Sequence, residues 1–161
     1  MSLAPSTPAR ASLLAIDPGR CTGWALYLDR RLVASGTTSV DSASCTAREL
    51  LAEGLAHLVI EEPRVRAPGK GEGDPNDLIG VAVQVGRWIE RAKSRGALVE
   101  AFDPHRWKGS IQKAPHHRQA RNVLDVYERE IAGDLPVSDT CKAANRWDAI
   151  ARGLWRLDRI C

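Results

Sequence analysis

The order of apolar runs and turn signals along the chain predicts short strands interrupted by helices. The apolar run at residues 13–16 is closed by the turn sequence Asp17-Pro18-Gly19, which indicates a buried strand and its exit. Two β-rich segments joined by the polar link Asp29-Arg30 predict a hairpin. The expected strands are residues 13–16, 22–28, 31–39, 57–60 and 97–102.

Apolar side chains at helical spacing predict four helices. The first ends at Gly54, a residue type favoured just past a helix C-terminus. Residues 63–76 contain three prolines and three glycines, a composition typical of an exposed, mobile loop. Residues 103–115 read as a basic connection rather than an element. The expected helices are residues 43–54, 77–95, 116–131 and 140–159.

This order of elements predicts the fold class. Hairpin-type strands followed by alternating helices and strands indicate an α/β fold with a five-stranded mixed sheet and helices on both faces. The chain has the length of one ordinary domain and shows neither an internal repeat nor a linker. We therefore expect one domain at residues 13–161, preceded by a flexible N-terminal tail at residues 1–12.

Composition narrows the class of protein. Hydrophobic residues make up 43% and charged residues 27% of the 161 residues, as in globular proteins. No apolar run is long enough to cross a bilayer and the first residues lack a secretory core, so we expect a cytoplasmic protein without membrane contacts. The four cysteines have neither Cys-x-x-Cys spacing nor suitably placed histidines, which argues against a zinc site and favours reduced thiols. The net charge of +3 is modest, so a nucleic-acid function depends on where the charge lies.

Three carboxylates occupy positions that suggest chemistry. Asp17 ends the first predicted strand, Glu61 ends the fourth, and Asp148 interrupts an otherwise apolar stripe of the last helix. Converging carboxylates suit two magnesium ions about 4 Å apart, which activate a water and stabilise the leaving oxygen of a phosphodiester. We therefore expect these three residues to be catalytic and to bind Mg²⁺, with Mn²⁺ able to substitute.

Each carboxylate also has an ordinary structural interpretation. Asp17 suits a turn, and Glu61 suits a solvated strand end. Asp148 suits an ion pair with Arg152 four residues later on the same helix. The functional interpretation depends on all three lying in elements that can converge.

The carboxylates lie in segments that resemble a known family. Residues 14–25, Leu-Ala-Ile-Asp-Pro-Gly-Arg-Cys-Thr-Gly-Trp-Ala, resemble the first motif of the RuvC family of Holliday-junction resolvases, including its bacteriophage members. Residues 59–61 resemble the second motif. Residues 145–151 resemble the closing helix, in which Asp148 takes the place of the last catalytic aspartate. Two further matches fall between these in the expected order, at residues 84–86 and 103–108.

The resemblance implies an RNase H-like fold, a homodimer, and symmetric nicking of branched DNA that leaves 5′-phosphate and 3′-hydroxyl ends. The chain departs from the family pattern in three places. Asn145 stands where the family has an acidic or histidine ligand, and its amide offers only a neutral oxygen; Asp139 is the alternative fourth ligand. Residues 64–66 replace an expected aromatic wedge, and residues 117–119 lack an expected lysine, whose place Arg118 could take.

A basic segment supplies the expected DNA contacts. Residues 104–122 hold five lysines or arginines, three histidines and one tryptophan but no acid, which suits a phosphate backbone, although a merely solvated segment is the alternative. Lys108 is also expected to stabilise charge at the scissile phosphate. The adjacent His116 and His117 would point in different directions on a helix, so neither is assigned to metal. The expected DNA-binding residues are Arg64, Arg66, Lys70, Arg106, Trp107, Lys108, Lys113, His117 and Arg118.

Three other functions compete with a resolvase. An actin-like phosphotransferase opens with a similar strand and turn, but such proteins close two domains around a nucleotide, so we expect no nucleotide cofactor here. A nuclease acting on RNA or on DNA ends would use the same carboxylates. A catalytically weak junction-binding protein is favoured by Asn145. Cleavage of four-way, flapped and linear substrates separates these functions.

Overall fold

The computed structural model of the chain contains five strands and four helices among the residues that it describes. The described residues are 12–39, 42, 46, 49–51, 54–64, 75–103, 106–107, 109, 111–138 and 142–161. The strands are β1 (Ser12–Asp17), β2 (Cys21–Leu28), β3 (Arg31–Ser39), β4 (His57–Glu61) and β5 (Leu98–Phe102). The helices are α2 (Pro75–Ser94), α4 (Lys113–Val123), α5 (Val126–Ala132) and α6 (Lys142–Arg156).

The strands form one mixed sheet in the order β3-β2-β1-β4-β5. Strand β2 runs antiparallel to β1 and β3, whereas β4 runs parallel to β1 and β5. Asp29 and Arg30 turn the β2–β3 hairpin with positive φ angles of 49° and 69°, as a tight two-residue turn requires. The predicted five-stranded mixed sheet is confirmed.

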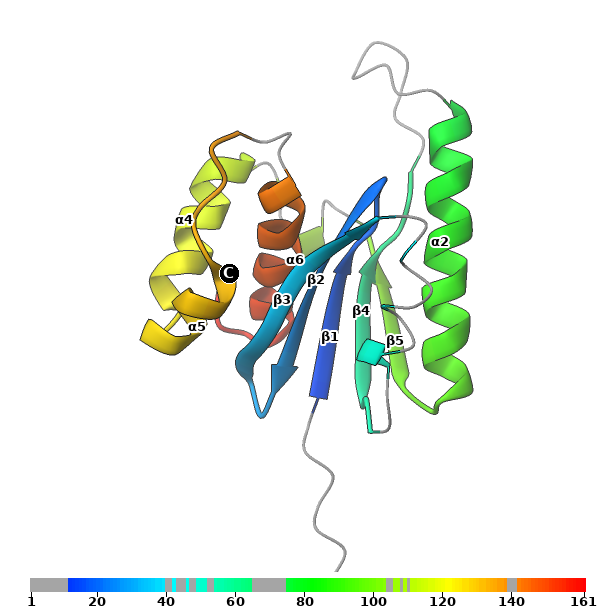
Figure 1. Ribbon diagram of the computed structural model, residues 1–161, viewed down its shortest axis with the longest axis horizontal. Helices are drawn as coiled ribbons and strands as arrows, with labels where there is room; N and C mark the ends of the chain where they lie inside the picture. The colour runs from blue at the N-terminus through cyan, green and yellow to red at the C-terminus, as the bar shows by residue number, and fades with distance from the viewer. Residues whose placement is uncertain are drawn as a thin grey trace, which may run out of the picture.

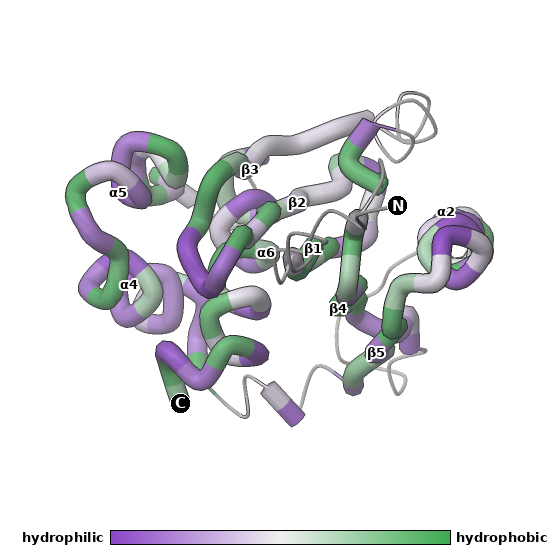
Figure 2. The backbone as a smooth tube through the Cα atoms, turned by 90° about the horizontal axis from the view of Figure 1, so that it is seen from below, coloured by the Kyte–Doolittle hydropathy of each residue, from purple (hydrophilic) through white to green (hydrophobic). Residues whose placement is uncertain are grey.

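Helices cover both faces of this sheet, as the sequence predicts (Figure 1). Helix α2 packs on β4 and β5. On the other face α6 packs on β1, β2 and β3, α5 packs beside it on β3, and α4 packs on α6. Figure 2, seen from below, places α2 on one side of the strands and α4 and α5 on the other. None of the described helices is both long and apolar enough to cross a membrane.

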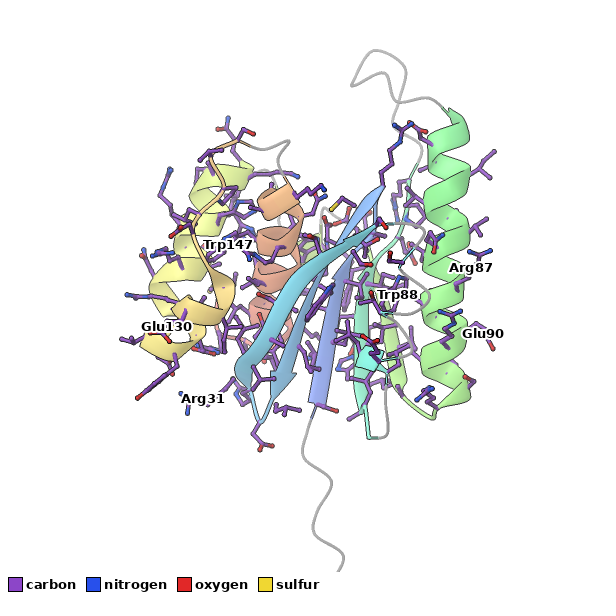
Figure 3. The ribbon with its side chains drawn as sticks, in the orientation of Figure 1. Arg31, Arg87, Trp88, Glu90, Glu130 and Trp147 are labelled. Carbon is purple, nitrogen blue, oxygen red and sulfur yellow. The ribbon has the colours of Figure 1, made fainter. Side chains whose placement is uncertain are left out.

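The alternation of side chains along β1 divides the core into two clusters. Leu13 and Ala15 join the cluster on the α6 face, whereas Leu14 and Ile16 join the cluster beneath α2. Trp88 of α2 is directed toward the sheet and is 1% exposed (Figure 3). Because residue 17 continues the odd-numbered series, the side chain of Asp17 emerges on the α6 face.

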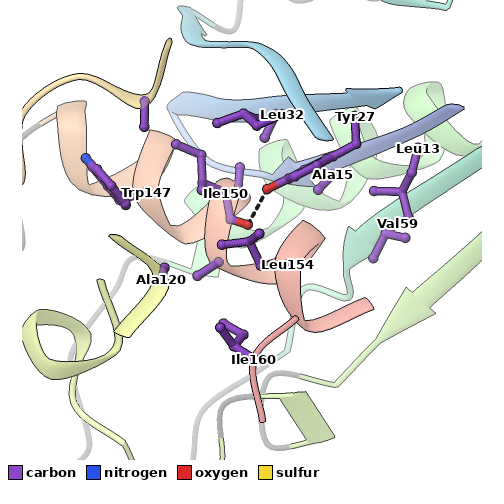
Figure 4. Packing of buried hydrophobic residues seen from close by; sticks show 14 of the residues in the cluster. Leu13, Ala15, Tyr27, Leu32, Val59, Ala120, Trp147, Ile150, Leu154 and Ile160 are labelled. Carbon is purple, nitrogen blue, oxygen red and sulfur yellow. Dashed lines mark hydrogen bonds between the residues drawn. The ribbon is translucent and has the colours of Figure 1, made fainter. Parts of the chain in front are cut away.

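Helix α6 lies unusually close to β2. The Tyr27 hydroxyl donates a 2.6 Å hydrogen bond to the backbone carbonyl of Ile150 (Figure 4). A Cβ placed on Gly153 would lie 2.2 Å from the Tyr27 ring, and one placed on Gly23 would lie 2.0 Å from the carbonyl oxygen of Asn145. Glycine at both contacts therefore lets the helix approach the strand.

Two expected helices differ from the structure. The single helix predicted at 116–131 is wrong, because α4 and α5 are separated at Leu124, whose backbone is extended. Asp125 then begins α5 with a capping box, in which its side chain accepts from the Glu128 backbone and the Glu128 side chain accepts from the Asp125 backbone. The final helix ends at Arg156, before Asp158 takes a positive φ of 53°.

Some predicted segments lie partly or wholly outside the described residues. They are most of the helix at 43–54, residues 1–11 of the tail and residues 65–74 of the loop.

Candidate active site

Asp17 and Glu61 meet at one edge of the sheet. They are the last residues of the neighbouring parallel strands β1 and β4, and the preceding residues Ile16 and Ile60 are register partners. Side chains of residues 15 and 59, two positions earlier, belong to the cluster on the α6 face. The two carboxylates therefore emerge side by side, beneath α6.

Arg152 of α6 joins these carboxylates. Its Nη2 atom donates to Asp17 Oδ1 at 3.0 Å and also to Glu61 Oε2. Its Nη1 atom donates to the backbone carbonyl of Ile16. The side chain is completely buried, and its guanidinium carbon lies 4.8 Å from the centre of the Trp107 ring. A cationic side chain thus occupies the point where the carboxylates converge.

Asp148 lies one turn before Arg152 on the same helix, and its residue is 4% exposed. The ammonium group of Lys113 lies 2.7 Å from Oδ2, and Nε2 of His117 lies 2.9 Å from Oδ1. Both partners come from α4, which packs against α6. Asp148 therefore does not form the local pair with Arg152 that helical spacing allows.

The environments of the two aspartates shift their pKa values in opposite directions. Burial raises the pKa of Asp17 to about 6, helped by the nearby Asp148 and Glu61 carboxylates and opposed by Arg152. Burial acts to raise the pKa of Asp148 as well, but the hydrogen bond from His117 and the charge of Lys113 outweigh it and lower the value to about 2. Asp148 is thus held as an anion, whereas Asp17 is not strongly stabilised in that form.

The donor atoms at this edge are of the kind that magnesium prefers, but the arrangement is not that of a metal site. Among the described residues, no group of three or more His, Cys, Asp or Glu side chains is placed to hold a metal ion. Each of the three carboxylates is instead paired with a basic side chain. The described side chains therefore do not fit a bound metal as they stand.

Two residues expected to contact DNA are buried. Trp107 is 4% exposed, and its Nε1 points to Glu61 Oε2 at 3.4 Å, so the ring is not available on the surface to stack on a base. His117 is 1% exposed and belongs to the surroundings of Asp148. Trp107 is buried against Arg152 and Glu61, and His117 is buried against Asp148.

The other basic residues lie nearer the surface. Arg118 is exposed on α4, a helix without acidic residues, whereas Arg64 pairs with Asp103 at 2.8 Å. Arg106 is exposed and lies over the Phe102 ring at 5.7 Å. The structure does not describe three of the predicted DNA-binding residues, which are Arg66, Lys70 and Lys108.

Asn145 lies at the site with its amide already engaged. Its Nδ2 donates to the backbone carbonyl of Cys21 at 2.7 Å, which fixes the start of α6 against β2. Gly23, which its backbone touches, is the register partner of Asp17. Its role as a metal ligand stays a prediction, and the alternative ligand, Asp139, lies outside the described residues.

The sequence predicts His117 as a DNA-binding residue and Arg152 as an ion-pair partner of Asp148, and it places neither side chain where the structure has it. Arg152 lies one turn after Asp148, so its presence on an otherwise apolar helix face was a usable signal. His117 falls on a helix without acids, where an unpaired surface cation was the simpler interpretation. Only the packing of α4 on α6 brings its ring to Asp148.

The order of the mixed sheet, the strand-end carboxylates and the closing helix define an α/β fold of the RNase H-like class. Among solved structures, the fold is similar to that of RuvC. The structure described as T. thermophilus RuvC in complex with Holliday junction substrate matches with a TM-score of 0.67 and 16% sequence identity, over 92% of this chain and 95% of that chain. A Thermus thermophilus RuvC structure matches with a TM-score of 0.65 and 18% identity, over 91% and 93%. No family model and no curated protein sequence matches the chain, so the likeness is one of fold.

Proposed function

We propose that this protein is a metal-dependent, structure-selective endonuclease that cleaves Holliday junctions or other branched DNA by phosphodiester hydrolysis. The observation that carries the proposal is the gathering of Asp17, Glu61 and Asp148 at one edge of a RuvC-like sheet, beside the acid-free helix α4. One of the matched structures is described as a complex with a Holliday junction. That title suggests the substrate class to test first.

The proposed parts of the site follow from their chemistry. Asp17, Glu61 and Asp148 are the proposed ligands of magnesium, or of manganese in its place, once the basic side chains that now pair with them have moved away. A bound ion would supply the Lewis acidity that phosphodiester hydrolysis needs. The chain itself would place the DNA, because exposed cations such as Arg118 and Arg106 attract the phosphate backbone. The expected products carry 5′-phosphate and 3′-hydroxyl ends.

A homodimer is part of the proposal, because two symmetric sites would cut two strands of a junction. The outer face of α2 supports it: Ile79 is 63% exposed and Val83, one turn later, is 49% exposed. Cβ atoms placed on Gly80 and Gly86 would meet nothing within 4 Å, so this helix surface is open and locally smooth. A second copy of α2 is the expected partner.

The test is cleavage of four-way, flapped and linear DNA, and of RNA, in the presence of magnesium. We expect the wild-type protein to cut four-way junctions in preference, and Asp17→Asn, Glu61→Gln and Asp148→Asn each to abolish cutting while junction binding persists. Glu62→Gln is the matched control, since Glu62 is exposed and follows the site by one residue. Equal loss in Glu62→Gln and little loss in Glu61→Gln would contradict the assignment, and preference for RNA or for DNA ends would move the protein to another class of nuclease.

A catalytically weak junction-binding protein is the second candidate. The observation that favours it is the pairing of every site carboxylate with a basic side chain in the described structure. Tight binding of four-way DNA without cleavage at any magnesium concentration would support this candidate.

A further inference from the structure

The guanidinium of Arg152 lies between Asp17 and Glu61, where a metal ion bound by both carboxylates would lie. One nitrogen atom, Nη2, donates to both carboxylates, and Nη1 donates to the carbonyl of Ile16, the residue before Asp17. The side chain is 0% exposed. A buried guanidinium with two carboxylate partners neutralises charges that would otherwise oppose burial.

The surroundings of Arg152 hold it there without satisfying it fully. The Trp107 ring lies against the guanidinium at 4.8 Å, a cation–π distance, and the Trp107 N–H points to the same oxygen of Glu61. The buried Nε atom of Arg152 has no hydrogen-bond partner in the described part of the structure. The guanidinium is therefore bound mainly through the edge that faces the two carboxylates.

The pair at Asp148 differs in how readily it opens. The side chain of Lys113 is 32% exposed, so its ammonium can leave Asp148 and remain hydrated. Arg152 has no such exposed position at its present site, because its side chain is enclosed by the sheet, α6 and Trp107. The contact of Arg152 with Asp17 and Glu61, rather than the contact of Lys113 with Asp148, is therefore the one that prevents a metal ion from binding.

We propose that Arg152 is a resident cation of this site, and that a divalent metal ion gains Asp17 and Glu61 only by displacing it. A guanidinium and a divalent ion cannot share the same carboxylate oxygens in a buried setting, because like charges a few ångströms apart repel strongly there. The inference rests on the proposed function for the identity of the metal ligands and deepens it by naming what competes with the metal. The resting site then keeps its shape without metal, and binds metal more weakly than free carboxylates would.

The experiment measures Mn²⁺ binding to the metal-free full-length protein by calorimetry. Arg152→Gln removes the competing charge, so we expect it to bind Mn²⁺ at least about tenfold more tightly than the wild type. Adding Asp17→Asn to this variant should cancel the gain. Arg156→Gln is the matched control, because Arg156 lies one turn later on α6 and pairs at 2.6 Å with Glu100 instead, and its affinity should equal that of the wild type. Equal or weaker binding by Arg152→Gln would overturn the proposal.

Thermal unfolding with and without Mn²⁺ covers the case in which Arg152→Gln is unstable. Without the guanidinium, two carboxylates lack a counter-ion, so this variant should melt lower than the wild type in chelator and gain more from Mn²⁺. If the variant is unfolded without metal, its refolding on addition of Mn²⁺ supports the proposal equally. A melting temperature of the variant that does not change with Mn²⁺ overturns the proposal. Junction cleavage is scored separately: absence of cutting by every variant, with the Mn²⁺ affinities as expected, refutes the proposed function alone.

Discussion

Asp17 and Asp148 show how two carboxylic acids in one site acquire different properties. Asp17 shares Arg152 with a second carboxylate, so burial and like charge prevail and its pKa rises to about 6. Lys113 and His117 both contact Asp148, so its pKa falls to about 2 despite its burial. For these two aspartates, the balance between burial and the basic side chains that contact them sets the direction of the pKa shift.

The opposite shifts predict opposite effects on stability when each aspartate is neutralised. Between about pH 4 and 6, native Asp17 keeps a proton that the unfolded chain has lost, so the free energy of unfolding falls as pH rises toward 6. Asp17→Asn removes this penalty, and in chelator it should stabilise the protein above pH 6 by up to about 3 kcal/mol relative to its effect at pH 4. Urea unfolding at a series of pH values measures the difference.

Asp148→Asn serves as the opposite control. Because its native pKa is lowered, Asp148 contributes stability that is present above about pH 4 and lost as pH falls toward 2. Its replacement should therefore destabilise the protein at neutral pH. The two pKa shifts would be misassigned if the effects of the two variants on stability, each taken relative to the wild type, changed in the same direction as the pH rises from 2 to 7.

At the scale of elements, α6 combines packing and chemistry. Asp148 and Arg152 lie one turn apart on the helix, and Gly153 next to them packs against the Tyr27 ring. Tyr27 is completely buried and is bonded to the backbone of the same helix, so it has little room to move. The position of the charged side chains over the sheet depends on this contact.

Gly153→Ala should therefore destabilise the protein by about 1–3 kcal/mol, because the added methyl group overlaps the Tyr27 ring. Denaturant unfolding measures the loss. Asn122→Ala in α4 is the control: Asn122 is exposed, so the better helix propensity of alanine should stabilise by about 0.5 kcal/mol. A neutral Gly153→Ala would show that α6 can move away from β2 at little cost.

The sequence predicts the elements where local signals are strong. Alternation and turn residues place the strands to within about one residue, including the hairpin at Asp29-Arg30. The break between α4 and α5 was missed, because helical periodicity continues through Leu124 and hides the capping box that starts at Asp125. Apolar periodicity alone therefore does not show where one helix ends and the next begins.

The site follows the same rule. The strand-end residues Asp17 and Glu61 are predictable, because parallel neighbouring strands end at one edge. The partners of Asp148 are not, since sequence spacing favours Arg152 whereas the fold supplies Lys113 from another helix. Ion pairs between distant elements depend on packing, which periodicity does not encode.

At the scale of the molecule, the acid-free helix α4 lies on the α6 side of the sheet, next to α5, which carries both signs of charge. Helix α4 is free of acids and exposes Arg118, whereas the outer surface of α2 mixes signs, with Arg87 and Glu90 both directed away from the sheet (Figure 3). This asymmetry favours DNA contact on the side that carries Asp148.

Arg118→Ala should weaken junction binding and reduce the slope of log affinity against log salt by about 0.9, as expected for one lost phosphate contact. Fluorescence anisotropy over a range of salt concentrations measures the slope. Arg87→Ala removes the same charge from the opposite side and should leave the slope unchanged. If the two variants behave alike, α4 is not the DNA-binding face.

The outer face of α2 predicts the oligomeric state. The wild-type protein should be a dimer at micromolar concentration, and Ile79→Glu should make it a monomer, because a charge would be buried between two copies of the helix. Sedimentation equilibrium measures the mass. Val126→Glu, at a 67% exposed position on α5, should leave it a dimer. A monomeric wild type, free and junction-bound, would remove the basis for paired cutting.

The close packing of α6 on β1 and β2 also bears on the timing of protein synthesis. Asp17 and Glu61 are translated early, whereas Asp148 and Arg152 lie near the C-terminus and are translated late. A nascent chain on the ribosome that has reached only Ala132 already carries the basic helix α4, yet lacks the helix that completes the carboxylate cluster and closes the core. Premature termination before Lys142 should therefore yield a product that quality-control proteases remove, rather than a truncated nuclease that damages DNA.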